Sequence, residues 1–448
     1  MNSRKDALIS RALVACATFA SVCAGALLSA GAAAQSPQAV AMISPVTASQ
    51  PAGCRAKPAW SDCVAVVAED GEDADAAAQV ASALARSGRF VALQSSAFPT
   101  AAESGAVAAS VWRNLGVDYL VLASPAGNGV LWHLSVRDLH QNGELAAYDV
   151  ARPAAAPSRD LARQAANRVF ETITGVPSTA DARIAYVAVT GVGRKHEYQL
   201  VVASGDAGGR RVIAASDEPI MAPSWSPDGR HIAYVKYWLG GSGIFVQDVA
   251  RGSVTRIVSE EGVNGAPAWS PDGTKLAVTL SVGNNTNIFV EDLVNHSRHR
   301  LTDSAAIDTE ATWSPDGRTV AFMSDRSGTP RIYTVSAEGG PAHLLNTPPL
   351  RCEEPRYSPD GKSMAMIARN KGKFQVAVLR LDSGDFEFVS QGPEDETPSF
   401  TPNGALLLYT AGDGALRHLK VVSVDGRIRH DLASGDDVRE PAWSPYLN

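Results

Sequence analysis

The pentapeptide Trp225-Ser226-Pro227-Asp228-Gly229 decides how the second half of this 448-residue chain folds, because it recurs. It returns at residues 269–273, 313–317, 357–361 and 400–404, and in a shortened form at residues 443–445. Successive aromatic positions lie 44, 44, 44, 43 and 43 residues apart. A constant period of about 40 to 50 residues is typical of folds built from repeated supersecondary units.

The chemistry of the pentapeptide predicts a hairpin corner. Ser or Thr is followed by Pro, whose φ is preset, then by Asp or Asn, and then by Gly, which tolerates a positive φ. An alternating apolar segment follows each corner, as at residues 232–235 and 276–278, and further strands are expected near residues 244–246 and 255–257. Four strands in about 44 residues correspond to one blade of a β-propeller.

The two ends of the repeat region have complementary defects. Residues 184–187 look like the strand that follows a pentapeptide, but no pentapeptide precedes them. Residues 443–445 lack the Asp-Gly pair and have no strand after them. We therefore predict that residues 440–444 complete the sheet begun by residues 184–215, which closes a six-bladed ring and removes its open edges.

The segments around the corners resemble those of the TolB family. WD-type repeats have a similar period, but no Trp-Asp pair occurs at the repeat positions. The segments that carry the resemblance are PIMAPSWSPDG at 219–229, NGAP at 264–267, TEATW at 309–313, DETPS at 395–399 and PAWSPYL at 441–447. The preceding domain, with FETITG at 170–175, is also similar to that family, so the resemblance covers residues 63–448.

This resemblance implies a noncatalytic periplasmic scaffold of the Tol-Pal cell-envelope system, which supports outer-membrane integrity and cell division. Such proteins bind the peptidoglycan-associated lipoprotein Pal through the propeller face. An extended N-terminal strand of the mature chain links them to the inner-membrane protein TolA. In this chain residues 40–43 are the candidate for that strand, within an extra N-terminal arm in which the chain departs from the family.

The region before the repeats alternates strand and helix signals and predicts an α/β domain at residues 63–178. Strands are expected at 64–67, 90–93 and 119–122, helices at 73–86 and 103–115, a hairpin over 130–150 and a last helix from 157 to 174. Asn142-Gly143 favours a type I′ turn in the hairpin. The propeller is assigned to residues 181–448.

The N-terminus predicts secretion. Arg4, Lys5 and Arg11 precede an uncharged stretch at 12–28 and small residues up to Ala34, which is the pattern of a signal peptide cleaved after Ala34. An uncleaved anchor is disfavoured because the stretch is rich in Ala, Ser and Thr. Residues 35–62 indicate a flexible arm. The expected compartment is the periplasm.

Of the five cysteines, Cys16 and Cys23 would leave with the signal peptide. Cys54 and Cys63 are the local pair for a disulfide, which an oxidising compartment permits. Cys352 is then the odd thiol and is expected to be buried. No Cys/His spacing of a zinc site occurs.

Composition narrows the class of partner. Lys and Arg number 40 against 47 Asp and Glu, without a long run of either sign, which disfavours nucleic acid as a partner. The 38 Gly and 26 Pro indicate many turns. We expect a monomer that reaches membranes only through its partners.

The candidate functional residues precede the pentapeptides. In a propeller the strand that leads into each corner lines the central channel, so the residues at its start form the channel mouth. These residues are Met221, Asn264, Thr309, Glu310, Glu353, Glu354, Glu396, Thr397, Arg439 and Glu440. By the resemblance, this mouth is the Pal-binding surface. No cofactor is predicted, although converging carboxylates could hold a cation or receive a basic, amide-rich segment.

An enzyme is the alternative. A serine hydrolase is disfavoured, because the chain has no G-x-S-x-G elbow and its first domain is small. A propeller hydrolase such as a lactonase, or a propeller dehydrogenase, using channel carboxylates and a metal, stays open.

Overall fold

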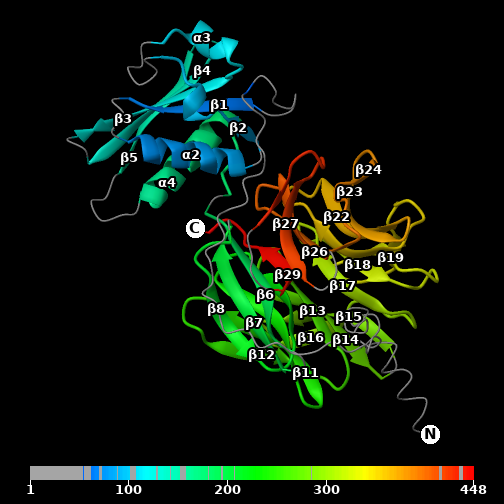
Figure 1. Ribbon diagram of the computed structural model, residues 1–448. Coiled ribbons are helices and arrows are strands. Elements are labelled where there is room, and N and C mark those ends of the chain that lie inside the picture. Colours follow the sequence, from blue (N-terminus) through cyan, green and yellow to red (C-terminus); the bar gives the residue numbers. More distant parts are fainter. Residues whose placement is uncertain are drawn as a thin grey trace, which may run out of the picture. The chain divides into compact units, whose positions relative to one another are not determined.

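The structure is a computed structural model that describes residues 54, 62–69, 73–87, 89–100, 107–127, 130–141, 143–151, 158–179, 181–192, 195–205, 207–283, 285–412, 416–432 and 437–447. The expected signal peptide, the candidate strand at residues 40–43 and nearly all of the arm lie outside these residues. The chain divides into two compact units, and the boundary falls between Ala182 and Arg183 (Figure 1). None of the described helices is long and apolar enough to cross a membrane.

The first unit is a five-stranded sheet with helices. Its elements are β1 (Asp62–Ala68), α2 (Ala74–Arg86), β2 (Phe90–Ala92), η2 (Ser95–Ala97), α3 (Ala109–Asn114), β3 (Tyr119–Ala126), β4 (Leu131–Asp138), β5 (Gly143–Ala151) and α4 (Ser158–Thr174). The strand order is β2-β1-β3-β4-β5, in which the first three strands are parallel and the rest antiparallel.

Two hydrophobic clusters cover the two faces of this sheet. On one face α2 and α4 pack over Val64 and Val66 of β1 and Trp132 of β4. On the other face Trp112 of α3 packs with Ala65 and other residues of β1 and β3. Helix α3 is shorter than the predicted 103–115, because Ala108 has an extended backbone and the helix begins only at Ala109.

The second unit consists of antiparallel strands in groups of four. Its strands are β6 (Arg183–Val192), β7 (Lys195–Ser204), β8 (Arg211–Ser216), β9 (Ile220–Trp225), β10 (His231–Trp238), β11 (Gly241–Asp248), β12 (Val254–Val258), β13 (Asn264–Trp269), β14 (Lys275–Val282), β15 (Asn285–Asp292), β16 (Ser297–Arg300), β17 (Asp308–Trp313), β18 (Thr319–Ser324), β19 (Arg331–Ser336), β20 (His343–Leu344), β21 (Cys352–Tyr357), β22 (Ser363–Asn370), β23 (Lys373–Arg380), β24 (Phe386–Phe388), β25 (Glu394–Phe400), β26 (Leu406–Gly412), β27 (Arg417–Ser423), β28 (Arg429–Asp431) and β29 (Asp437–Trp443). Four groups form separate sheets, and the groups β21–β24 and β25–β28 join through one parallel pair, Phe374 with Glu394.

Six strands of this unit lie next to one another in sequence order. They are β9, β13, β17, β21, β25 and β29, and we call them the inner strands. Each of them contacts the following one, and β29 contacts β9. The aromatic residue at the end of an inner strand links it to its neighbour: the indole N–H of Trp269 donates to the carbonyl oxygen of Ser224 at 3.1 Å, and that of Trp225 donates to the carbonyl oxygen of Ala442 at 3.2 Å.

The pentapeptides form the corners that their chemistry predicts. In the first corner the N–H of Gly229 donates to the carbonyl oxygen of Ser226, and the Ser226 hydroxyl donates to Asp228 while it accepts the N–H of His231. The corners also contact one another. A Cβ added at Gly273, whose φ is +72°, would lie 3.7 Å from Pro227 of the preceding corner. That distance is an ordinary van der Waals contact, so glycine is needed here for the positive φ of the turn and not for space.

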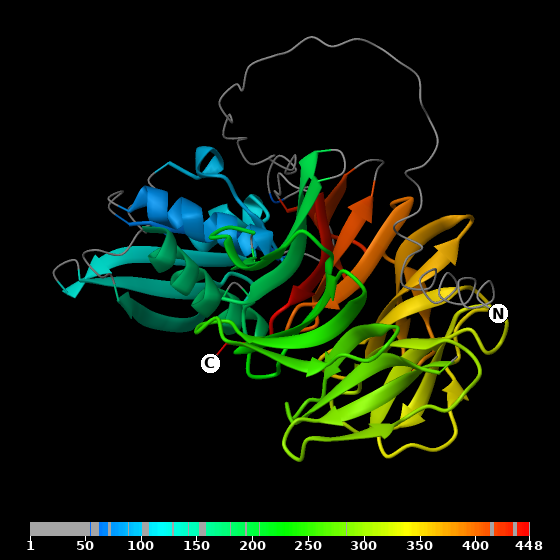
Figure 2. The same cartoon turned by 90° about the horizontal axis from the view of Figure 1, so that it is seen from below.

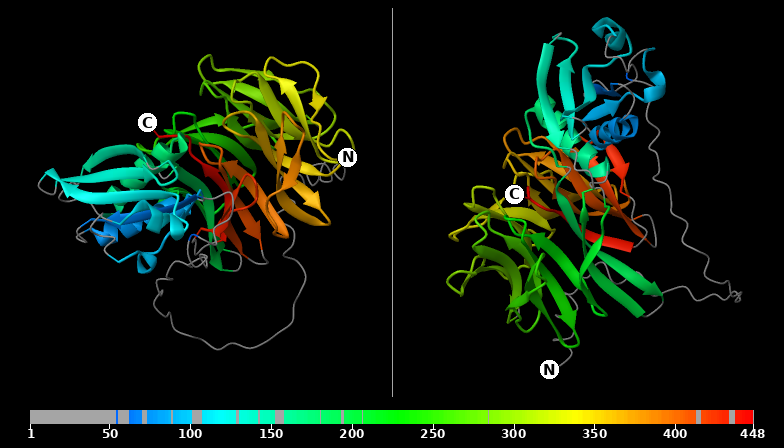
Figure 3. Two further views of the ribbon diagram at one scale, coloured as in Figure 1. Left: turned by 90° about the horizontal axis from the view of Figure 1, so that it is seen from above. Right: turned by 90° about the vertical axis from the view of Figure 1, so that its left-hand side faces the viewer.

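The C-terminal strand pairs with the first strand of this unit. β29 runs antiparallel to β6, with Val438 opposite Ala188 and Trp443 opposite Ile184. The N–H of Ser444 donates to the carbonyl oxygen of Arg183 at 2.8 Å. The red C-terminal strand lies beside a green strand in Figure 2, and between green and orange strands in Figure 3.

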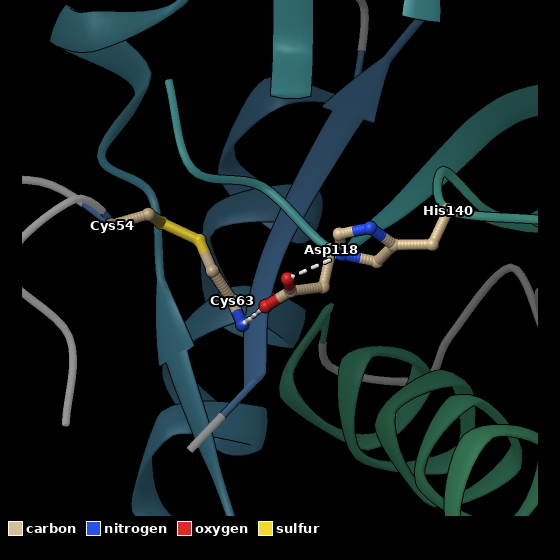
Figure 4. Close-up of a disulfide and its surroundings, with 4 residues drawn as sticks. All are labelled: Cys54, Cys63, Asp118 and His140. Carbon is tan, nitrogen blue, oxygen red and sulfur yellow. Dashed lines mark hydrogen bonds and ion pairs between the residues drawn. A yellow bond between two sulfur atoms is a disulfide. The ribbon is translucent and has the colours of Figure 1, made fainter. Parts of the chain in front are cut away.

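A disulfide joins Cys54 to Cys63 at the start of β1, with the two Cα atoms 5.7 Å apart. Asp118 supports the same strand: its Oδ2 accepts the N–H of Cys63 at 2.6 Å, and its Oδ1 lies 2.8 Å from Nε2 of His140 (Figure 4). The third cysteine among the described residues, Cys352, is a buried free thiol. Burial raises the pKa of this thiol to about 11, so it stays protonated at neutral pH.

Candidate functional site

Every inner strand carries a bulge at the same position. The bulged residues have left-handed backbones, with φ between 43° and 58°; they are Ala222, Ala266, Glu310, Glu354, Thr397 and Glu440. The strand register shifts at each of these positions. Positive φ is uncommon for residues other than glycine and persists only where the surroundings enforce it. We call these six residues the rim.

The residue after each bulge is buried. In five inner strands it is a proline, and in the sixth it is Ala311. Proline has no N–H, so the irregular backbone of the bulge leaves one donor fewer to be satisfied. The bulge is thus a repeated feature of the fold and not an irregularity of one strand.

Three rim glutamates connect neighbouring inner strands. Oε2 of Glu310 accepts the backbone N–H of Glu354 at 2.7 Å. In the same way Glu354 accepts the N–H of Thr397 at 2.5 Å, and Glu440 of β29 accepts the N–H of Ala222 in β9. Each of these carboxylates therefore reaches one strand forward, from one rim residue to the next.

The surroundings of these carboxylates favour their protonated form. Burial, together with the nearby Glu353, raises the pKa of Glu310 to about 7. Burial also raises the pKa of Glu440 to about 7, against the opposing effect of the Ala222 N–H. The pKa of Glu354 lies well above its ordinary value because of burial and the adjacent Glu310. Glu310 and Glu440 therefore titrate near neutral pH.

Ion pairs surround the rim. Glu353 pairs with Arg351 at 2.6 Å, and Arg439 pairs with Asp437 at 2.8 Å. Glu396 lies 3.3 Å from Arg417 of β27, and burial raises the pKa of Glu396 although Arg417 opposes the shift. Sequence reasoning named one member of each pair and missed the other.

Two of the predicted mouth residues are buried. Asn264 is 0% exposed; its side chain accepts the N–H of Glu260 at 2.8 Å and donates to the carbonyl oxygen of Ser242 at 3.3 Å. Thr309 is 2% exposed, and its hydroxyl lies 3.1 Å from the hydroxyl of Thr279. Both side chains are buried and make internal hydrogen bonds that stabilise the surface above them. They are therefore not part of the surface that we propose contacts a partner.

The other mouth residues are more accessible. Met221 is half-buried, as is the rim residue Thr397. Sequence reasoning missed Ala222 and Ala266, which have no reactive group. The signal that finds them is the period, because each rim residue stands three positions before the aromatic residue of its repeat. Among the described residues, no group of three or more His, Cys, Asp or Glu side chains is placed to hold a metal ion.

The raised pKa values predict a pH-dependent stability. The folded protein keeps protons on Glu310 and Glu440 up to about pH 7, whereas the unfolded chain releases them near the ordinary value of 4.5. This contribution to stability is complete below pH 4.5 and is lost as the pH rises through 7. We expect Glu440→Gln, which keeps an acceptor for the Ala222 N–H, to reduce the fall in melting temperature between about pH 5.5 and pH 8.

Thermal melts in a pH series measure this effect. Glu387→Gln is the matched control, because Glu387 is exposed on β24. Equal pH profiles for wild type and Glu440→Gln would show that Glu440 does not titrate in this range.

A family model described as TolB beta propeller domain matches residues 170–447. The chain belongs to the TolB family. The Tol-Pal system protein TolB of Methylococcus capsulatus is 56% identical over 391 residues, which cover 85% of this chain and 91% of the relative. That of Thioalkalivibrio sulfidiphilus is 52% identical, and the match covers 84% of this chain and 87% of the relative.

The crystal structure of TolB from Acinetobacter baumannii is similar over 87% of this chain and 98% of that one, with a TM-score of 0.79 and 32% identity. The family that the segments around the corners resemble, and the β-propeller that the repeats predicted, are thereby confirmed.

Proposed function

We propose that the chain is a noncatalytic component of the Tol-Pal system in the periplasm. Its second unit is a six-bladed propeller closed by β29, which binds Pal at the face that carries the rim. Its N-terminal arm links to TolA. Relatives named as Tol-Pal system proteins match 84% and 85% of this chain, which supports the assignment.

One observation carries the choice of the rim face. Six inner strands present the same bulge, and three glutamates fasten one strand to the next, including β29 to β9. Such a surface is preorganised, so it loses little conformational entropy when a partner binds. A catalytic acid or base must reach the substrate proton. The rim carboxylates instead each use one oxygen to hold a neighbouring strand.

Binding of Pal tests the proposal. Calorimetry with the mature chain and the soluble domain of Pal from the same bacterium is expected to show a complex. Glu310→Ala removes the acceptor of the Glu354 N–H, and an unsatisfied buried donor costs about 1–3 kcal/mol. The loss loosens the rim in the free protein. Because Pal would then meet a rim that is no longer preorganised, we expect binding to be roughly 10-fold weaker, which corresponds to about 1.4 kcal/mol.

Glu310→Gln is the control, because its amide oxygen still accepts the N–H, and we expect it to bind nearly as wild type. Absence of a complex between folded wild-type protein and Pal would contradict the proposal. Metal-dependent hydrolysis of a lactone by the same preparation would favour the enzyme.

A further inference from the structure

The hairpin between β10 and β11 exposes apolar side chains at its tip. Leu239 is 95% exposed and Trp238 is 36% exposed. Residues 237–243 contain no charged side chain. A single exposed apolar residue is ordinary on a protein surface. Here, however, the next group repeats the feature, because Val282 at the tip between β14 and β15 is 53% exposed.

Both hairpin tips lie on the same face of the second unit as the rim. In the first group Lys236 of β10 pairs with Ile220, the first residue of β9, so Trp238 and Leu239 extend beyond the start of the inner strand. In the next group Leu280 pairs with Asn264, the first residue of β13, and Val282 follows. The pentapeptide corners are at the opposite ends of these strands.

A hydrogen bond from a buried side chain connects the tip between β10 and β11 to the inner strand of the next group. Asn264 begins β13 and donates to the carbonyl oxygen of Ser242, which is the second residue of β11. This internal hydrogen bond fixes the tip between β10 and β11 beside the start of β13.

The tip is held in one shape. The Trp238 indole lies against two glycines: a Cβ added at Gly241 or Gly243 would come within 3.0 to 3.1 Å of its ring atoms. The ring also makes an edge contact with Phe245, with 6.3 Å between centroids. Because Trp238 fixes the loop, Leu239 is presented without a large loss of freedom on binding.

A different hairpin on the same side is basic. Arg369, Lys371 and Lys373 are exposed at the tip between β22 and β23. Cys352 begins the inner strand of that group and pairs with Ala368, so this tip also lies beyond the start of an inner strand. The rim face thus has neighbouring apolar tips and a separate basic tip.

We propose that the tip formed by Trp238 and Leu239 anchors a protein partner on the rim face. The partner's surface would have an apolar pocket that receives Leu239, and carboxylates that face Lys371 and Lys373. Anchoring side chains in partner pockets dominate binding energy, while opposite charges speed association. The inference rests on the proposed function, in which that partner is Pal.

Substitution of Leu239 in the full mature chain tests the anchor. Leu239→Asp is expected to weaken binding of soluble Pal at least about 10-fold, whereas Leu239→Met keeps most of the affinity. Val294→Asp is the matched control. Val294 is 66% exposed and lies in the turn between β15 and β16. This turn is at the same end of the strands as the pentapeptide corners, because the N–H of Leu293 donates to the carbonyl oxygen of Thr274. We expect that variant to bind as wild type.

Charge reversal tests the basic tip. Lys371→Glu combined with Lys373→Glu is expected to slow association and to reduce its dependence on salt. All of the substituted side chains are exposed, so the variants should stay folded. Lys373 also stabilises the nearby buried carboxylate of Asp395, so its reversal is expected to lower the melting temperature slightly, whereas the Leu239 variants should melt as wild type. An association rate equal to that of wild type at low salt would show that the basic tip does not face carboxylates of the partner.

The outcomes separate the two proposals. If wild type binds Pal and Leu239→Asp binds equally well, the anchor is refuted and the proposed function stands. If wild type does not bind Pal, the proposed function fails, and the anchor fails with it. Binding of wild type to phosphatidylglycerol vesicles, or self-association in sedimentation, with either lost in Leu239→Asp, would assign the tip to a bilayer or a second copy and overturn the anchor.

Discussion

Deletion of residues 440–448 is expected to lower the melting temperature of the second unit by more than about 10 °C, since about 1 kcal/mol shifts it by roughly 2–4 °C in domains of about 150–250 residues. The deletion removes the second half of β29, so Ile184 and Ala185 of β6 lose their partners on that edge while β6 keeps its pairing with β7. It also removes Glu440, which accepts the Ala222 N–H, and the carbonyl of Ala442, which accepts the indole N–H of Trp225.

Loss of packing adds to the lost hydrogen bonds. Trp443 is half-buried and packs against the cluster that contains Ile184 and Tyr186. Truncation of a fully buried Trp costs about 3–5 kcal/mol, so loss of this contact is expected to cost somewhat less. An open strand edge also favours aggregation. Circular dichroism and light scattering during heating measure both effects.

A shorter deletion provides the control. Removal of residues 447–448 keeps every strand of the unit and loses mainly the packing of Leu447 over Gly229. We expect a shift of only a few degrees. A melting temperature that is unchanged by the longer deletion would reject the role of β29 in completing the sheet of β6.

Local chemistry explains why so much of this fold could be predicted. The pentapeptide sets its own turn, since Pro227 and Gly229 favour the conformations that the corner needs and Ser226 bonds within the corner. The pairing of β29 with β6 was predicted because the repeats at residues 184 and 443 are each incomplete and together make up one complete repeat. Both signals are present in neighbouring residues or in the period.

The backbone conformation and the contacts of the rim residues could not be predicted in this way. The corner chemistry predicts positive φ at glycine, yet Ala222 and Glu310 also adopt it because the inner strands hold them there. The sequence suggested a partner or a cation for the carboxylate of Glu310, and the structure shows that it accepts the N–H of Glu354. The burial of Asn264 depends on Ser242, which belongs to another group of strands. These contacts are set by packing between groups, which the period does not encode.

A second large effect is expected from Arg326→Ala. Asp308, the first residue of β17, is 0% exposed, and both of its carboxylate oxygens accept hydrogen bonds from Nη2 of Arg326 at 2.9 Å. Asn287 and Ser304 donate to Oδ2 of the same carboxylate at 3.2 and 3.1 Å. The guanidinium also lies 4.8 Å from the ring centroid of Tyr333.

Without Arg326, the buried carboxylate of Asp308 accepts hydrogen bonds only from neutral donors. Breaking a fully buried ion pair in this way costs about 3–5 kcal/mol. Since the side chain of Arg326 is 26% exposed, water screens part of the charge, and we expect a loss of about 2–4 kcal/mol. Thermal or urea unfolding measures the loss.

The double variant Asp308→Asn with Arg326→Met separates the charge from the packing. It removes both charges, keeps a side chain that can bond to Ser304, and places an apolar chain over Tyr333, so it should recover much of the stability that Arg326→Ala loses. If the double variant is no more stable than Arg326→Ala, the loss does not come from the unpaired charge of Asp308. The hydrogen bond of the guanidinium to Ser324 and its cation–π contact with Tyr333, neither of which Met can make, would then be the main contributions of Arg326.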